Sequence, residues 1–107
     1  NYGKMKRDFT YIDDIVLGVR ASIEKNYRSE IFNLGNDSPV KTIDLLGMIE
    51  SKMHNKTTIK HVQTFNESMY THADIAKAKK LLGYQPKVNI DEGLNHFINW
   101  YKDYAQK

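Results

Sequence analysis

The spacing of apolar positions changes near residue 12 from one typical of a strand to one typical of a helix. Residues 8–12 favour an extended conformation, because they include Phe, Thr and Tyr. From there on, apolar side chains recur at helical spacing: Ile12, Ile15, Val16, Val19 and Ile23. Asp13 and Asp14 stand where a cap and a first-turn anion stabilise the free N–H groups of a helix. The pattern predicts a strand that runs directly into a helix ending near residues 25–26.

The same spacing predicts three further helices. Residues 43–54, 75–82 and 90–101 each carry an apolar stripe. A side chain able to cap a helix precedes each of them, namely Thr42, Asp74 and Asn89. Gly83 provides a C-terminal stop for the third helix. In the last helix we expect one buried face, formed by Ile90, Leu94, Phe97, Ile98 and Tyr101.

Two other segments have the composition of short strands. Residues 30–34 end at the turn-forming run 35–39, and residues 57–62 are rich in β-favouring side chains. With residues 8–12 they make about three strands beside four helices. No repeat, low-complexity tract or linker interrupts the chain. We therefore predict an α/β fold, α+β as an isolated piece, in a single domain over residues 1–107.

Composition narrows the functional classes. The 107 residues are 40% hydrophobic and 27% charged, which is typical of a globular protein, and no apolar run is long enough to cross a membrane. The chain has no cysteine, so disulfides, thiolate metal sites and a cysteine nucleophile are excluded. A cytoplasmic location is expected. The net charge of +3 comes from dispersed Lys and Arg, which favours a solvated basic surface over a binding site for a polyanion.

The N-terminal residues have neither an initiating Met nor an apolar leader. We therefore expect the chain to be a piece of a longer protein.

The residue types alone reveal no catalytic set. The histidines His54, His61, His72 and His96 are scattered, and no pair has the spacing of a zinc-binding helix, so no metal site is expected. Neighbouring carboxylates at Asp13 and Asp14 would point in different directions on a helix.

Arg7 is the most distinctive of the candidate residues. It lies beside the predicted strand-to-helix junction, where its fork of N–H donors could bind a phosphate or a carboxylate. The alternative is a solvent-exposed Arg, or an ion pair with Asp8, Asp13 or Asp14. The local pattern leaves both interpretations open.

Six short runs, in order and at suitable intervals, resemble the C-terminal portion of nucleotide-sugar epimerases and dehydratases of the extended short-chain dehydrogenase/reductase family, closest to the UDP-glucuronate 4-epimerase type. Together they cover nearly the whole chain. The runs are Asn1-x-Gly3-x-Met5-x-Arg7-Asp8-Phe9-Thr10-Tyr11-Ile12-Asp13-Asp14-Ile15, Ile31-Phe32-Asn33-Leu34-Gly35-Asn36, Pro39-Val40, Thr71-x-Ala73-Asp74, Leu81-Leu82-Gly83-Tyr84-x-Pro86, and Glu92-Gly93-Leu94 to Trp100-Tyr101.

The resemblance implies a substrate-binding role for four residues. Arg7 would grip the diphosphate of a UDP-sugar, and the hairpin that begins at Asn1 would approach the uracil through its backbone. Glu67 takes the place of an aspartate that accepts hydrogen bonds from ribose hydroxyls, although Asn66 replaces the glycine that usually precedes it. An Arg or Gln upstream corresponds to Gln63, or to Thr64 if the match shifts by one residue.

The resemblance also implies what the chain does not carry. We identify neither the Gly-x-x-Gly-x-x-Gly run that binds a dinucleotide nor the Tyr-x-x-x-Lys pair that removes the substrate proton. We therefore expect no catalytic residue here, and NAD bound by an N-terminal Rossmann domain outside this chain. The expected partners are a UDP-sugar, that domain, and a second copy in a homodimer or other self-association, with no nucleic acid and no membrane.

Three alternatives remain beside this interpretation. A nucleotide-sugar dehydratase or reductase of the same family would share the layout of this region. A small basic module could bind single-stranded nucleic acid by stacking bases on its aromatic side chains, such as Tyr2, Phe9, Tyr11 and Phe65. The chain could also be a pure interaction module.

Overall fold

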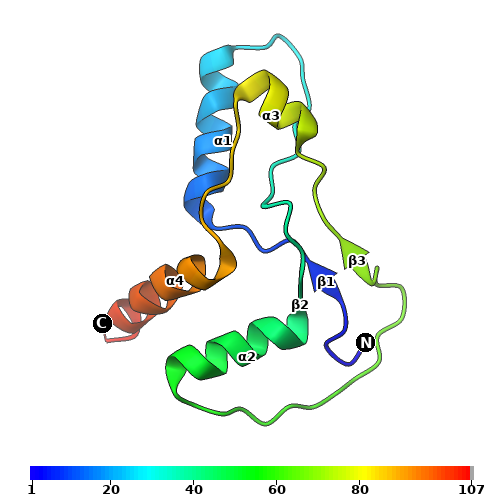
Figure 1. Cartoon of the computed structure of the whole chain (residues 1–107), viewed down its shortest axis with the longest axis vertical. Coiled ribbons are helices and arrows are strands. Elements are labelled where there is room, and N and C mark those ends of the chain that lie inside the picture. Colours follow the sequence, from blue (N-terminus) through cyan, green and yellow to red (C-terminus); the bar gives the residue numbers. More distant parts are fainter. Residues whose placement is uncertain (107) are drawn as a thin grey trace.

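The computed structural model describes residues 1–106, and a small three-stranded sheet lies at its centre (Figure 1). Its strands are β1 (Lys6–Arg7), β2 (Val40–Lys41) and β3 (Tyr70–Thr71), in the order β2-β1-β3. β1 pairs antiparallel with β2 and parallel with β3. The sheet thus joins three segments that are far apart in the sequence.

Four helices surround this sheet: α1 (Ile12–Lys25), α2 (Thr42–Met53), α3 (Ala76–Leu82) and α4 (Ile90–Ala105). α1 packs against α3, and α2 contacts α4 on the other side of the sheet (Figure 1). The predicted α/β class, with four helices and three strands, is confirmed.

The C-terminal ends of α1, α2 and α3 and the start of α4 lie where the sequence predicted them. Asn26, His54 and Gly83 end their helices in the left-handed conformation. Asn89 caps α4 by accepting a hydrogen bond from the backbone N–H of Glu92. Thr42 does not cap α2, because its hydroxyl donates instead to the carbonyl of Met5 at 3.0 Å and ties the helix to the N-terminal hairpin.

The predicted positions of the strands were wrong. Residues 8–11, 30–34 and 57–62 form no strand, and pairing occurs instead at 6–7, 40–41 and 70–71. β-Favouring side chains become a strand only where a partner edge is available, and the register of this sheet is set by contacts distant in sequence. The extended segments nevertheless carry the chain between sheet and helices.

The largest buried cluster lies between α1, α3 and the segment that follows α3. It consists of Ile75, Ala78, Leu82 and Tyr84, with Ala21, Phe32, Leu34 and Ala73 packed around it. Burial, together with the nearby carboxylates of Asp14 and Asp8, raises the pKa of the Tyr84 hydroxyl, which donates a hydrogen bond to the carbonyl of Gly35 at 2.8 Å. The phenol therefore stays neutral and acts as a donor.

Much apolar surface stays outside this core. The radius of gyration is 16.4 Å, compared with about 13 Å for a typical compact chain of this length. α1 buries Asp14 and Gly18, whereas its apolar stripe faces outward, with Ile23 71% exposed. The prediction that Phe97 and Tyr101 are buried on α4 was also wrong, because they are 55% and 48% exposed.

Asp13 and Asp14 lie in the first turn of α1, as predicted, but neither of them caps the helix. The cap residue is Tyr11, and no side chain accepts a hydrogen bond there. Asp14 is 2% exposed, and its two carboxylate oxygens accept the backbone N–H groups of Lys87 and Val88, each at 3.0 Å. The carboxylate therefore anchors the segment between α3 and α4, while Asp13 remains exposed.

Replacement of Asp14 by Asn is expected to lower the free energy of unfolding by about 1–3 kcal/mol, because an amide offers only one acceptor oxygen to the two backbone N–H groups that the buried carboxylate now satisfies. Urea unfolding followed by circular dichroism would measure this. The matched control is Asp13→Asn, expected to change stability by no more than about 0.5 kcal/mol. Equal effects of the two variants would contradict the assigned anchor.

Gly35→Ala is expected to destabilise the fold by about 1–3 kcal/mol. A Cβ at Gly35 would lie 2.7 Å from the Cβ of Ala73 and 2.5 Å from a carboxylate oxygen of Asp8. The control is Gly47→Ala in α2, where a Cβ meets nothing within 4 Å, so Ala should stabilise by about 0.5–1 kcal/mol through helix propensity. Thermal unfolding of both variants would test these opposite signs.

Candidate functional site

Arg7 carries a cation that no carboxylate neutralises among residues 1–106. One guanidinium nitrogen (Nη1) donates to the carbonyl of Lys6 at 2.9 Å, and the other (Nη2) donates to the sulfur of Met5 at 3.4 Å. None of the ion pairs found in this part of the chain includes Arg7. The ion-pair alternative weighed for this residue is therefore wrong.

The carboxylates near Arg7 have other partners. Asp8 accepts the backbone N–H groups of three successive residues, Asn36, Asp37 and Ser38, at 3.0–3.2 Å. Asp14 is occupied by the segment that precedes α4. Since a guanidinium has five N–H donors and Arg7 uses two of them here, a fork remains for an anion.

A row of hydrogen bonds connects Arg7 to the predicted Asn1 and Glu67. The side-chain amide of Asn1 contacts the sulfur of Met5 at 3.3 Å and donates to the hydroxyl of Thr64 at 2.9 Å. The Thr64 hydroxyl in turn donates to a carboxylate oxygen of Glu67 at 2.9 Å. The structure thus brings three predicted site residues into one polar row.

Gln63 is the member of the predicted set that this row does not include. Its neighbour Val62 accepts backbone hydrogen bonds from Asn1 and Tyr2, so the backbone of this segment lies beside the N-terminal hairpin. Within residues 1–106, however, the bridging contact comes from Thr64, the other position considered in the resemblance. The sequence offered no signal to choose between the two.

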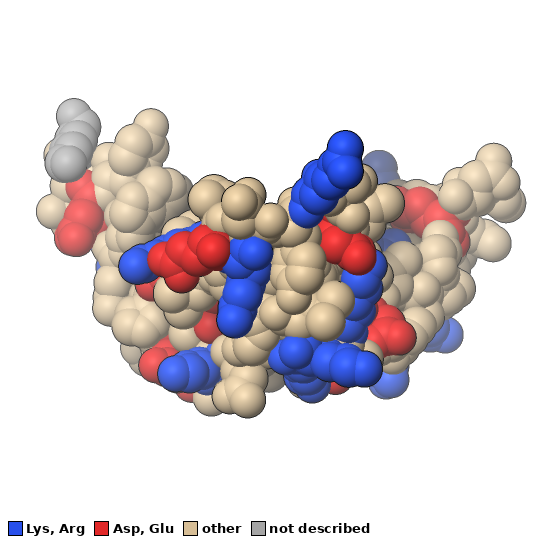
Figure 2. Space-filling view, turned by 90° about the horizontal axis from the view of Figure 1, so that it is seen from above, with Lys and Arg blue, Asp and Glu red and all other residues tan. Residues whose placement is uncertain are grey.

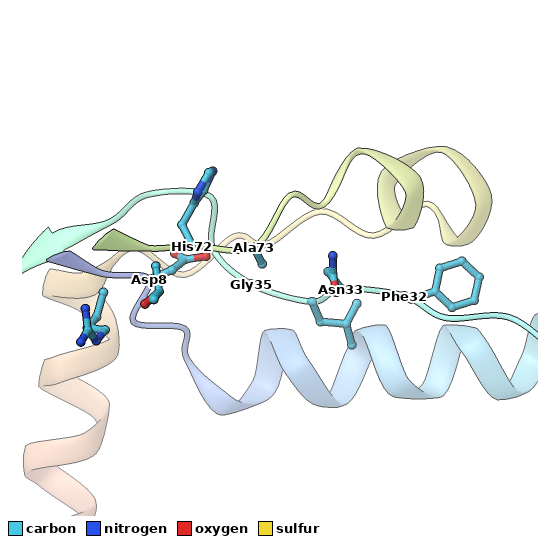
Figure 3. A pocket seen from close by; sticks show the side chains of 9 residues that line it. Asp8, Phe32, Asn33, Gly35, His72 and Ala73 are labelled. Atoms are coloured by element: carbon cyan, nitrogen blue, oxygen red, sulfur yellow. The ribbon is translucent and has the colours of Figure 1, made fainter. Parts of the chain in front are cut away.

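Arg7 also lines an open cavity of about 510 Å³. Its walls come from β1, from the extended segment 32–35 and from residues 71–73. Asp8, Asn33 and His72 are among the side chains that line it (Figure 3). Segments that the sequence separates by tens of residues therefore form one wall around the cation.

His72 was missed by the sequence analysis. Its Nε2 lies 3.4 Å from a carboxylate oxygen of Asp37, and that same carboxylate lies 3.4 Å from the ammonium of Lys79. The residue occupies the variable position of the run 71–74, so the motif itself carried no signal for it. Its place beside the cavity follows from the pairing of β3 with β1.

A second hollow, of about 400 Å³, lies between the N-terminal hairpin, α2 and residues 59–64. Most of its wall is apolar, and the rings of Tyr2 and His61 stack nearby with centroids 6.2 Å apart. Met5 lines this hollow and also contacts Arg7. The cation and the apolar hollow are therefore neighbours, with Met5 between them.

The glycine motif that binds a dinucleotide is not found in this sequence. The chain's six glycines never occur in the spacing of a dinucleotide-binding loop. The spacing Tyr-x-x-x-Lys does occur once, at Tyr2 and Lys6, so the prediction that the chain lacks it was wrong. Tyr2 lies in a turn and Lys6 in β1, however, so these two side chains do not share a helix face as residues four apart on a helix do.

The surface charge is mixed. Figure 2 shows Lys and Arg side chains interspersed with Asp and Glu over the face that is seen from above. Lys77 pairs with Glu30, and Lys79 with Asp37. This face has no continuous basic stripe of the kind that follows a nucleic-acid backbone.

None of the helices within residues 1–106 combines the length and the apolar composition that crossing a membrane would require.

Known proteins resemble the chain over nearly its whole length. It is 36% identical to UDP-glucuronate 4-epimerase 3 of Arabidopsis thaliana over 97% of the chain, and 39% identical to UDP-glucuronate 4-epimerase of Thermodesulfobacterium geofontis over 94%. The structure of UDP-glucuronic acid 4-epimerase from Bacillus cereus, in complex with UDP-glucuronic acid and NAD, superposes with a TM-score of 0.86 at 32% identity, covering 95% of this chain and 33% of that one. No family model matches.

These proteins are much longer than the chain, which spans 28% of the Arabidopsis relative and 32% of the bacterial one. The matched part is the C-terminal one. The chain is thus homologous, over nearly all of its residues, to the C-terminal part of the UDP-glucuronate 4-epimerases.

Proposed function

We propose that the chain is the substrate-binding C-terminal part of an NAD-dependent nucleotide-sugar epimerase of the extended short-chain dehydrogenase/reductase family, and that it binds UDP-glucuronate. The observation that carries this proposal is Arg7, a cation on a strand with no carboxylate partner among the described residues and with donors left for an anion. A planar guanidinium binds a phosphate group through two parallel hydrogen bonds. The relatives and the Bacillus cereus enzyme carry the same activity in their names.

The polar row suggests how a nucleotide would lie. Arg7 at one end takes the diphosphate, and Glu67 at the other accepts a hydrogen bond from a ribose hydroxyl. Only one carboxylate oxygen of Glu67 is bonded to Thr64, so the other is left to accept. Asn1 lines the second hollow, and in this proposal Asn1, chiefly through its backbone, and Gln63 would contact the base.

In this proposal the chain binds the substrate and supplies no catalytic residue. The dinucleotide loop and the proton-removing pair belong to an N-terminal NAD-binding domain outside residues 1–107, so the isolated chain is inactive. Contacts to the nucleotide lie remote from the reacting carbon. Their binding energy holds the sugar where hydride transfer can occur, which lowers the entropic part of the barrier.

The outward face of α1 fits this division of roles. Ile12, Val16 and Ile23 are each more than half exposed, and Ile31 in the following segment is 82% exposed. Such a contiguous apolar stripe is a contact surface. We propose that the NAD-binding domain covers this stripe in the whole enzyme, and that the isolated chain covers it by self-association. The whole enzyme would work as a cytoplasmic homodimer.

Titration with UDP and with UDP-glucuronic acid is expected to shift amide NMR signals around Arg7 and Glu67. Arg7→Ala should weaken UDP binding by at least tenfold, because a charge-assisted contact contributes about 1.5–3 kcal/mol. The matched control is Arg28→Ala, an exposed arginine outside the polar row, which should leave the affinity unchanged.

The proposal makes opposite predictions from the nucleic-acid alternative. Binding of mixed oligonucleotides that weakens steeply with salt, with no preference for UDP, would contradict it. A folded sample that shows no shifts with millimolar UDP would equally contradict the claim that this chain holds a nucleotide by itself.

Self-association is expected from the apolar stripe of α1. Light scattering after size exclusion should report a mass above 12.5 kDa, or the chain should bind a hydrophobic dye. The double variant Val16→Lys with Ile23→Lys should lower both signals without changing the helical circular dichroism, since both side chains are exposed. If the unsubstituted chain is monomeric and binds no dye, this expectation is refuted.

A further inference from the structure

The backbone of Met5 is fixed by hydrogen bonds to α2. Its carbonyl accepts two hydrogen bonds from Thr42, one from the backbone N–H at 2.9 Å and one from the hydroxyl at 3.0 Å. Its side chain is partly buried and lines the apolar hollow next to α2. The thioether therefore projects from a backbone whose carbonyl is held by two hydrogen bonds from the first residue of α2.

The sulfur of Met5 meets two side-chain donors from the proposed nucleotide site. Nη2 of Arg7 lies 3.4 Å away and the amide nitrogen of Asn1 lies 3.3 Å away. A thioether is a weak and uncharged acceptor. Because it is uncharged, it can orient a guanidinium without neutralising it, whereas a carboxylate in its place would compete with an anionic ligand.

We propose that Met5 is a positioning residue that holds Arg7 for the diphosphate of the nucleotide. This inference rests on the proposed function, since it assumes that Arg7 contacts the diphosphate. The sulfur and the carbonyl of Lys6 fix the two ends of the guanidinium, so its remaining donors present a defined fork. The amide of Asn1 shares the same sulfur, which couples the diphosphate end of the polar row to its other end.

The test is a set of substitutions at position 5, with the affinity for UDP measured by NMR titration or calorimetry. Met5→Leu keeps the volume and removes the acceptor, and should weaken binding about three- to tenfold, as for one lost hydrogen bond. Met5→Gln restores a neutral acceptor and should recover most of the affinity. Met5→Glu introduces a charged acceptor that pairs with Arg7, and should weaken binding more than Leu does.

A double-mutant cycle separates positioning from general structure. If Met5 acts through Arg7, then Met5→Leu should have no further effect in the Arg7→Ala background. Equal losses in both backgrounds, or no loss from Met5→Leu alone, would overturn the inference. Met48→Leu in α2 is the matched control, because Met48 is also half-buried but lies outside the polar row.

Failure of the proposed function would look different. In that case the Arg7→Ala variant would bind UDP with the same affinity as the unsubstituted chain. The guanidinium NMR signals of Arg7 in the free protein then give a separate test of the contact: Met5→Leu should move them and Met48→Leu should not. Unmoved signals would overturn the inference whatever UDP does.

Discussion

The centre of this structure depends on the hydrogen bonds that the carboxylate of Asp8 accepts. Asp8 follows β1 directly and accepts three successive backbone N–H groups from residues 36–38. This fixes the loop after Gly35 against the end of β1, and the hydroxyl of Tyr84 then holds the carbonyl of Gly35 from the other side. With its oxygens engaged in this way, Asp8 does not neutralise the guanidinium of Arg7, its neighbour in sequence.

Asp14 acts in the same way, because its two oxygens anchor the segment between α3 and α4. Asp14 is buried and Asp8 is half-buried, and both carboxylates are satisfied by backbone N–H groups that lie outside the helices and the sheet. They hold loops where an ordinary domain would pack apolar side chains. The apolar stripe of α1 faces outward.

The candidate site depends on how the long segment between α2 and β3 returns to the sheet. Its first part is fastened to α2, where Glu50 accepts two hydrogen bonds from Thr57, and these bonds lower the pKa of the Glu50 carboxyl. Its last part is fastened to β1, because the N–H of Lys6 donates to the carbonyl of Met69. Fixed at both ends, the segment carries Thr64 and Glu67 past Asn1, more than sixty residues away in sequence.

The sequence by itself determined the helices, because their spacing, the Asn89 cap and the Gly83 stop are local properties of the chain. It also pointed to Arg7, whose local pattern left two interpretations open until the resemblance favoured an anion-binding role. Only the tertiary structure decided where the strands pair, which of two adjacent aspartates is buried, and that Thr64 rather than Gln63 joins the polar row. Each of these depends on a partner distant in sequence, such as Val88 for Asp14 or Asn1 for Thr64, and no local pattern records such a partner.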